Sequence, residues 1–322
     1  MGHGATKSGG AAALVEAMRV RHWTKNVFVL AALPFSGKWT DPSAWAMAWG
    51  AFAAFCLLSS AIYLINDIAD RKSDLAHPVK NRRPIASGRL SPSLAAGAAG
   101  VLLIGGAGIV ALLSWKLYRP GLPIAGMGLA AWSGAYVLIN LAYSLGLKGR
   151  AILDVLIVAM GFVLRAMAGA SAIAAVISPW LVVCTFMLCL FIALAKRRGE
   201  IVALGDDAAG QTRRANRFYT PANIEHMLAV SAGLAILTYS LYCLAPATVE
   251  RIGSSHLIWT IPLVVYGMFR YYCLTLSAGG DDPVGVLIRD KVLWLVAAAW
   301  LVCVIVVLRW GGSEAVRGLL LQ

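Results

Sequence analysis

Charged residues are scarce in this sequence. Only 13% of its 322 residues are charged, and Asp and Glu together number 15, whereas a soluble globular domain carries roughly 25% charged residues. A hydrophobic share of 60% and a mean hydropathy of +0.75 accompany this shortage. These values exclude an ordinary soluble domain and indicate a membrane protein that crosses the bilayer several times.

Cysteine is also infrequent and scattered. The six cysteines lie inside apolar runs and form no CxxC pair; they are Cys56, Cys184, Cys189, Cys243, Cys273 and Cys303. Cysteines in such runs act as small hydrophobic residues. The pattern therefore supports neither a disulfide framework nor a cysteine metal site.

The sequence contains no long polar or low-complexity linker. Apolar runs recur along nearly the whole chain, which predicts a single membrane domain over residues 15–311. Residues 1–14 are predicted to be a disordered N-terminal tail, because the first ten are rich in Gly and lack an apolar core. Residues 312–322 are predicted to be a C-terminal tail.

Long apolar windows make up most of the rest of the chain. They predict an all-α polytopic fold with about nine transmembrane helices, each long enough to cross about 30 Å of hydrocarbon. The first window is the shortest, because Pro34 interrupts it. The approximate spans are 24–37, 43–66, 92–115, 121–145, 151–173, 178–196, 222–247, 256–276 and 288–311.

Lysine and arginine gather on one side of this predicted topology. The N-terminus and every second loop, starting after the second span, hold 21 of the 28. By the positive-inside rule that side is cytoplasmic, which predicts a multi-pass protein of the cytoplasmic (inner) membrane. Contact with anionic membrane lipids accounts for much of the net charge of +13. No aromatic platform accompanies the basic residues, so nucleic acid is not expected as a partner.

The most informative polar stretch is NDIADRKSDLAHPVKNRRPIASG, residues 66–88, directly after the second apolar window. Steps of three and four residues separate Asp67, Asp70 and Asp74. If the helix continues, these carboxylates fall within about 60° of one face and converge on one point. Hard oxygen ligands favour Mg²⁺, which bridges carboxylates to substrate phosphates. Asp67, Asp70 and Asp74 are therefore the predicted metal ligands, with Asn66 positioning one of them.

Basic side chains follow the carboxylates at once. Lys80, Arg82 and Arg83 supply guanidinium and ammonium groups that bind phosphate. His77 precedes Pro78 and is interpreted as organising the loop, with metal ligation as the alternative. The whole stretch predicts a diphosphate–Mg²⁺ site at a membrane surface.

The NDxxDxxxD pattern at the end of the second predicted helix resembles the UbiA superfamily of intramembrane prenyltransferases, and the resemblance spans about residues 19–310. Four further segments resemble its decaprenyl-phosphate phosphoribosyltransferase branch: HPVKNRRPIASG (77–88), RVRHWTKN (19–26), LAYSLGLK (141–148) and the segment 154–169 ending LRAMAG. The resemblance implies a cavity that faces the cytosol. It also implies Mg²⁺-dependent transfer of 5-phosphoribose from phosphoribosyl pyrophosphate to a polyprenyl phosphate, such as decaprenyl phosphate, with release of pyrophosphate.

One departure from the wider superfamily supports the narrower resemblance. Aromatic-acceptor members carry a second Asp-rich motif after the sixth helix, whereas this loop begins KRRGE. Glu200, Asp206 and Asp207 lack the spacing that stacks carboxylates on one face. A basic cluster suits a second phosphorylated substrate better than a neutral aromatic acid. An aromatic-acceptor prenyltransferase that uses a prenyl diphosphate is the alternative.

In the reaction that the resemblance implies, Asp67 and Asp70 are catalytic, because they hold the ion that neutralises the departing pyrophosphate. A phosphate monoester is mostly dianionic at pH 7, so the lipid phosphate needs no general base. Arg165 is included as a charge within an apolar helix, where charges usually face a cavity or a partner. The sequence leaves a homo-oligomer open. The predicted substrate-binding residues are Lys25, Asn66, Lys80, Arg82, Arg83, Lys148, Arg165, Lys196 and Arg197.

Overall fold

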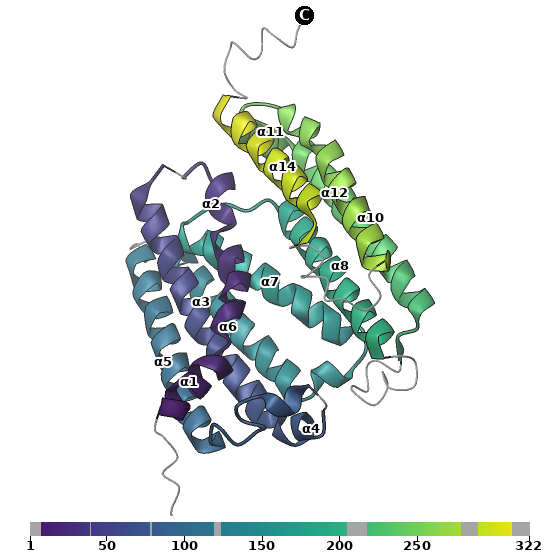
Figure 1. Cartoon of the computed structure of the whole chain (residues 1–322). Coiled ribbons are helices and arrows are strands. Elements are labelled where there is room, and N and C mark those ends of the chain that lie inside the picture. Colours follow the sequence, from purple (N-terminus) through teal and green to yellow (C-terminus); the bar gives the residue numbers. More distant parts are fainter. Residues whose placement is uncertain are drawn as a thin grey trace, which may run out of the picture. The chain divides into compact units, whose positions relative to one another are not determined.

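A computed structural model describes residues 8–38, 40–77, 79–118, 124–204, 218–277 and 289–310. These residues form helices and no β-strand, so the all-α prediction is confirmed (Figure 1). The predicted C-terminal tail, residues 1–7 of the N-terminal tail, and Asp206 and Asp207 lie outside the described residues.

The helices fall into long and short groups. The long α-helices are α3 (Pro42–Ala69), α5 (Pro92–Leu117), α6 (Ile124–Leu145), α7 (Leu153–Ala172), α8 (Pro179–Leu204), α10 (Pro221–Leu244), α12 (Ile261–Ser277) and α14 (Lys291–Trp310). The short α-helices are α1 (Ser8–Ala17), α2 (Ala32–Phe35), α4 (Arg71–Leu75) and α11 (Pro246–Ile252). The 3₁₀ helices are η1 (Val20–Leu30), η2 (Lys80–Arg82), η3 (Leu147–Gly149) and η5 (His256–Thr260).

Polar caps followed by proline begin three of the long helices. Asp41 accepts a hydrogen bond from the N–H of Ser43 at the start of α3, and Ser91 caps α5 in the same way. Thr220 and Asn223 form a reciprocal capping box at the start of α10. Each cap satisfies an N–H group that has no partner within the helix, and proline at the first turn needs none.

Eight helices of the described residues are long and apolar enough to cross a membrane. They correspond to the last eight predicted spans. The first predicted span, 24–37, is different, because it forms η1 and then the short α2. The prediction of about nine long helices is therefore corrected to eight within the described part of the chain.

The segment that contains η1 and α2 runs antiparallel to α3. Trp23 donates a hydrogen bond to Ser60 (3.0 Å), and Leu33 packs near the start of α3 against Ala44 and Ala48. A 3₁₀ helix rises about 2.0 Å per residue, so the eleven residues of η1 cover about 22 Å. An apolar run too short for a spanning α-helix thus follows α3 over much of its length.

The N-terminal tail prediction also needs correction. α1 begins at Ser8, so residues 8–14 are helical where a disordered segment was expected. Ala13 and Ala17 are buried against Ala61 and Leu64 of α3. This packing stabilises a helix that the glycine-rich sequence alone does not favour.

The contacts divide the chain into two compact units. The first comprises Met1–Lys148 and Leu164–Val176, and the second comprises Gly149–Val163 and Ile177–Gln322. In the first unit, a core that includes Leu64 and Ile85 lies among α1, α3 and α5. In the second, Phe191, Leu228 and Tyr271 belong to the core formed by α8, α10 and α12. The single membrane domain over residues 15–311 stays a prediction.

Candidate active site

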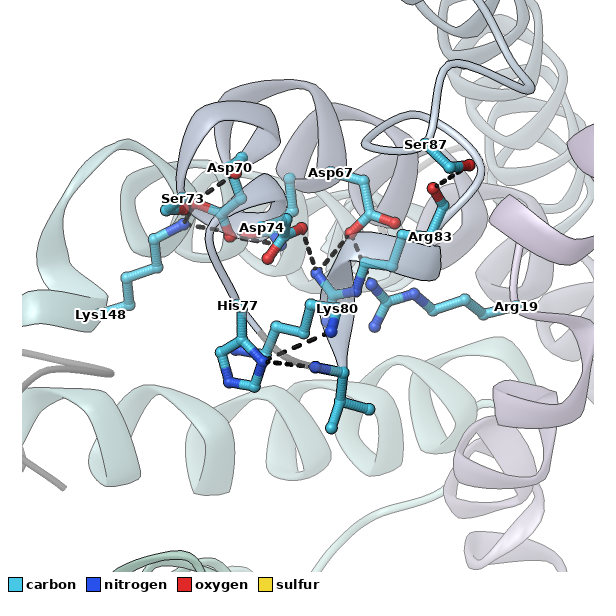
Figure 2. A network of polar contacts seen from close by, with 12 residues as sticks. Arg19, Asp67, Asp70, Ser73, Asp74, His77, Lys80, Arg83, Ser87 and Lys148 are labelled. Atoms are coloured by element: carbon cyan, nitrogen blue, oxygen red, sulfur yellow. Dashed lines mark hydrogen bonds and ion pairs between the residues drawn. The ribbon is translucent and has the colours of Figure 1, made fainter. Parts of the chain in front are cut away.

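The predicted metal ligands lie at the C-terminal end of α3, in the first unit. Asp67 is in the last turn of α3, Asp70 is its C-cap, and Asp74 follows in α4. The N–H of Asp70 donates to the carbonyl of Asn66 (2.9 Å), and that of Asp74 donates to the carbonyl of Asp70 (2.8 Å). Helical spacing therefore continues across the junction, and the three carboxylates lie next to one another (Figure 2).

Two of these carboxylates share one guanidinium group. Arg83 Nη1 donates to Asp67 Oδ1 (3.1 Å) and to Asp74 Oδ2 (2.8 Å). Arg19 Nη2 donates to the same Asp67 Oδ1 (2.5 Å). The Asp67 side chain is 2% exposed. A carboxylate this deeply buried requires such charged partners to remain ionised.

The third carboxylate has a separate set of partners. Asp70 forms an ion pair with Lys148, which lies in η3, and accepts a hydrogen bond from Asn66 Nδ2 (3.1 Å). Lys148 Nζ also approaches Asn66 Oδ1 (3.4 Å). The Asp70 side chain is 21% exposed, so Asp70 is the most accessible of the three carboxylates. Lys148 is a cation that the sequence predicted for this site.

The three carboxylates form two groups, and their role as metal ligands stays a prediction. Asp67 and Asp74 meet at Arg83, whereas Asp70 meets Lys148. Among the described residues, no group of three or more His, Cys, Asp or Glu is arranged to hold a metal ion. Mg²⁺ usually takes only one or two carboxylates and completes its shell with waters and substrate phosphates. The oxygen donors of this site fit that arrangement.

The loop after α4 is organised by His77. Its Nδ1 accepts hydrogen bonds from the N–H groups of Val79 (3.2 Å) and Lys80 (3.4 Å), as Figure 2 shows. The interpretation of His77 as a loop-organising residue is therefore confirmed. These bonds set the start of η2, the short turn that precedes Arg83. Arg82 in the same turn is exposed.

A second contact ties this loop to α1. Arg89 donates two hydrogen bonds to Glu16 (2.8 and 2.9 Å) and a third to the carbonyl of Arg82 (2.8 Å). The Arg89 guanidinium lowers the pKa of the Glu16 carboxyl from its ordinary value. The pair is exposed, so it contributes little energy, but it joins α1 to the segment that carries Arg83.

Arg165 belongs to a different polar cluster of the first unit. It is buried in α7 and donates to Asn26 Oδ1 (2.8 Å) and to the hydroxyl of Tyr136 (2.8 Å). Asn26 also donates to Ser59 (3.2 Å). Ser59 precedes Asp67 by eight residues, about 12 Å along α3. Arg165 is thus linked, through Asn26, to a part of α3 that lies about two turns before Asp67.

The basic cluster of the second unit contains two environments. Lys196 is exposed. Arg197 is buried, and its guanidinium donates to Asp154 Oδ2 (2.6 Å) and to Glu200 Oε2 (2.5 Å). Its charge is therefore already balanced by two carboxylates, and its contact with a phosphate stays a prediction.

Sequence reasoning missed the groups that complete these networks. Tyr219 donates to Asp154 Oδ1 (2.8 Å) and accepts from the N–H of Ile152 (2.7 Å); burial and the bond to Asp154 raise the pKa of its hydroxyl. Arg19 enters the sequence-based prediction only as part of the segment RVRHWTKN, with no role of its own. Its contact with Asp67 joins residues 48 positions apart, a separation at which one sequence gives no spacing signal.

Residues 26–284 match the model of the UbiA prenyltransferase family. The chain belongs to this family. The resemblance predicted from the Asp-rich run is therefore confirmed. Asn26 of η1 is the first matched residue, and Lys25, which is half-buried, directly precedes it.

Two relatives match this UbiA family member over most of its length. It is 32% identical over 297 residues to the decaprenyl-phosphate phosphoribosyltransferase of Corynebacterium glutamicum, covering 91% of this chain and 85% of the relative. It is also 32% identical over 302 residues to the decaprenyl-phosphate phosphoribosyltransferase of Mycolicibacterium smegmatis, covering 89% and 90%.

A solved structure has the same fold. The UbiA homolog from Archaeoglobus fulgidus bound to GPP and Mg²⁺ superposes with a TM-score of 0.63 over 90% of this chain and 98% of that chain. The two sequences are 17% identical, so the likeness extends to the fold alone. The UbiA-like fold class is thus supported by both sequence and structure.

Proposed function

We propose that this protein transfers 5-phosphoribose from phosphoribosyl pyrophosphate to a polyprenyl phosphate and releases pyrophosphate. The observation that carries the proposal is the cluster of three carboxylates (Asp67, Asp70 and Asp74) and three cations (Arg19, Arg83 and Lys148) at the end of α3. It is supported by the two relatives that are named decaprenyl-phosphate phosphoribosyltransferase. The site faces the cytoplasm in this proposal, where Mg²⁺ and phosphorylated metabolites are present.

The cluster suits a substrate that carries a diphosphate and a divalent ion together. A bound Mg²⁺ would neutralise charge on the departing pyrophosphate. Asp70 and Asn66 offer accessible oxygens to the ion, and Asp67 and Asp74 offer buried ones. Arg83 and Lys148 are the cations nearest to the pyrophosphate oxygens in this proposal, and they hold the leaving group in one orientation.

The acceptor needs no positioned base. A lipid phosphate is mostly dianionic at pH 7, so one of its oxygens attacks C1 of the ribose while the bond from C1 to the pyrophosphate oxygen breaks. The sugar carbon becomes oxocarbenium-like during this exchange, as in other glycosyl transfers. Lys196, which is exposed at the α8 basic cluster, is the candidate contact for a second phosphate.

Purified protein in detergent tests the proposal. We expect phosphoribosyl pyrophosphate and a polyprenyl phosphate to yield, in the presence of Mg²⁺, a lipid whose mass has increased by one phosphoribosyl group. The free polyprenol should react very poorly, because it lacks the ionised nucleophile. The Asp70→Asn protein serves as the inactive control.

The same preparation tests the aromatic-acceptor alternative. A prenyl diphosphate and an aromatic acid should give no product if the proposal is correct. A prenylated acid, together with unchanged polyprenyl phosphate in the first assay, would replace the proposed reaction with the alternative. Equal rates with polyprenol and polyprenyl phosphate would show that a general base has been overlooked.

A further inference from the structure

One carboxylate oxygen of the site is shared by two arginines. Asp67 Oδ1 lies 2.5 Å from Arg19 Nη2 and 3.1 Å from Arg83 Nη1. The same carboxylate is one of those that the proposed function assigns to a divalent ion. Two guanidinium groups and a divalent cation on one oxygen would repel one another strongly. Metal and arginine therefore compete for Asp67.

Arg19 is held beside Asp67 by several independent contacts. Its backbone is left-handed (φ 53°, ψ 50°), a conformation that bulky residues rarely adopt. Its N–H donates to the carbonyl of Glu16 (3.1 Å), and its own carbonyl accepts from His22 (2.7 Å). The guanidinium carbon lies 5.0 Å from the centre of the Tyr63 ring, one helical turn before Asp67. The fold thus directs this side chain to one face of α3.

We propose that Arg19 exchanges partners during the reaction: it pairs with Asp67 until a divalent ion takes that carboxylate, and then binds the pyrophosphate group of the substrate. The inference rests on the proposed function, because it requires a metal-bound diphosphate at this site. Arg83 makes the same exchange at Asp67, and Asp74 keeps it in place. Arg19 is therefore a substrate-binding residue in addition to those that the sequence predicted.

Every charged group of the site keeps a partner of opposite charge in this exchange. Arg19, Arg83 and Lys148 pair with Asp67, Asp74 and Asp70. A metal ion and a diphosphate arrive together with opposite charges, so the carboxylates gain the metal while the cations gain the phosphate oxygens. Arginine binds a phosphate through two parallel N–H donors, whereas Arg19 makes a single N–H contact with Asp67. The new pairing is the stronger one for arginine.

The side chains have room to make this change. The side chains of Arg19 and Arg83 are 22% and 25% exposed, although Asp67 beneath them is 2% exposed. Each arginine side chain is therefore partly open to solvent, where a phosphate group can approach it. Removing the Arg19 guanidinium should therefore change two affinities in opposite directions. The affinity of Asp67 for the metal ion should rise because a competing cation is gone, and the affinity for pyrophosphate should fall because a phosphate-binding cation is gone.

The test measures two affinities of the full-length protein in detergent. Mn²⁺ binding alone is followed by the electron paramagnetic resonance signal of the free ion, and binding of radiolabelled inorganic pyrophosphate is measured at saturating Mn²⁺. The variants are Arg19→Gln, Arg19→Lys and Arg71→Gln. Arg71 is exposed in α4, and no ion pair of its side chain is found among the described residues, so it controls for the loss of one nearby positive charge.

The proposal predicts opposite changes in the two affinities. In Arg19→Gln, Mn²⁺ should bind about 10-fold more tightly and pyrophosphate about 10-fold more weakly than in the wild type. In Arg71→Gln, each affinity should change by less than about 2-fold, because exposed charges are screened. Arg19→Lys should recover much of the pyrophosphate affinity, which also shows that the site is intact without the guanidinium.

Several outcomes would overturn the exchange. Weaker Mn²⁺ binding in Arg19→Gln, or unchanged pyrophosphate binding, would mean that Arg19 only supports the shape of the site. Equal changes in Arg19→Gln and Arg71→Gln would mean that the loss of one positive charge, and not the position of Arg19, causes the change in affinity. If the wild type binds both Mn²⁺ and pyrophosphate but Arg19→Gln behaves like Arg71→Gln, this inference alone fails. If the wild type binds neither Mn²⁺ nor pyrophosphate, the proposed function fails as well.

Discussion

Asp67 and Asp70 are only three residues apart, but their surroundings differ. The Asp67 side chain is 2% exposed and accepts from two arginines, whereas that of Asp70 is 21% exposed and accepts from Lys148 and Asn66. Removing one partner of a buried ion pair leaves an uncompensated charge, which is far more costly than the same loss at a surface. Substitution of Asp67 should therefore lower both stability and activity, whereas substitution of Asp70 should lower activity alone.

The first prediction compares Asp67→Asn with Asp70→Asn. Each should reduce turnover at least about 10²-fold, since each removes a ligand charge from the ion that binds pyrophosphate. Only Asp67→Asn should also lower the thermal midpoint in detergent, because Arg19 and Arg83 lose their shared carboxylate. Steady-state kinetics and a thermal scan of both proteins provide the measurement. Near-wild-type turnover in two intact variants would refute the metal assignment.

The second prediction separates Lys196 from Arg197. Lys196→Ala should weaken use of one phosphorylated substrate by about 10-fold to 10²-fold and leave the thermal midpoint unchanged, because an exposed cation contributes only a charge-assisted bond. Arg197→Ala should lower the thermal midpoint, because Asp154 is fully buried and loses its cation. Substrate titrations at two Mg²⁺ concentrations and thermal scans distinguish the two effects.

A double variant supplies the control for Arg197. Asp154→Asn combined with Arg197→Ala should be more stable than Arg197→Ala alone, since the orphaned charge is removed together with its partner. Strictly additive losses would mean that the ion pair is not the source of the effect. Loss of substrate affinity in Arg197→Ala at full stability would instead support the predicted phosphate contact of Arg197.

Individual partners in the site could not be derived from one sequence. The three- and four-residue steps of the Asp-rich run were sufficient to place Asp67, Asp70 and Asp74 together, because helical geometry is local. The partner of each carboxylate is not local: Arg19 is 48 positions from Asp67, and Lys148 is 78 positions from Asp70. The sequence therefore predicted which charged residues lie close together. It did not predict that Asp67 and Asp74 pair with Arg83 while Asp70 pairs with Lys148.

Among the elements, the long helices were predictable and η1 was not. Eight apolar windows correspond to the eight helices of the described residues that are long and apolar enough to span a membrane, because length and hydropathy alone define such a helix. The remaining window contains Pro34 and is short, so neither signal specifies its form. Side-chain bonds to α3, such as those from Trp23 and Asn26, hold it as a 3₁₀ helix instead. Packing against α3 therefore determines the conformation of η1.

The packing of α7 on that 3₁₀ helix gives a third prediction. A Cβ atom on Gly169 would lie 1.8 Å from the carbonyl oxygen of Val29, and backbone cannot move aside as a flexible side chain does. Gly169→Ala should therefore destabilise the protein by about 3 kcal/mol or more. Gly97→Ala in α5 is the matched control, because nothing lies within 4 Å of its Cβ position.

Thermal midpoints and solubility after detergent extraction measure this pair. The alanine at position 97 should be neutral or slightly stabilising, since alanine favours a helix by up to about 1 kcal/mol over glycine. A Gly169→Ala protein as stable as the control would show that α7 and η1 separate easily, and the close approach would then have no energetic role.

For the whole molecule, Arg19 and the Asp-rich run lie at the same end of α3. Arg19 contacts Asp67 at the C-terminal end of α3, while Leu33 packs against Ala44 near its N-terminal end. The segment between them therefore covers most of the length of α3 in the opposite direction. The orientation predicted from the charge asymmetry therefore does not require this segment to be one of the eight long helices of the described residues, and it stays a prediction.

The final prediction tests that orientation with the two ends of α5. This helix has 26 residues, about 39 Å, which exceeds about 30 Å of hydrocarbon, so its ends should reach opposite surfaces. Ser93 lies at the end that follows the Asp-rich loop and Lys116 at the other end, and both are exposed. A membrane-impermeant maleimide should label Lys116→Cys in right-side-out vesicles and Ser93→Cys in inside-out vesicles. The wild type measures the background from its six native cysteines. Labelling of Ser93→Cys from the outside would place the carboxylates away from cytoplasmic phosphoribosyl pyrophosphate, and the proposed reaction would then lack its donor.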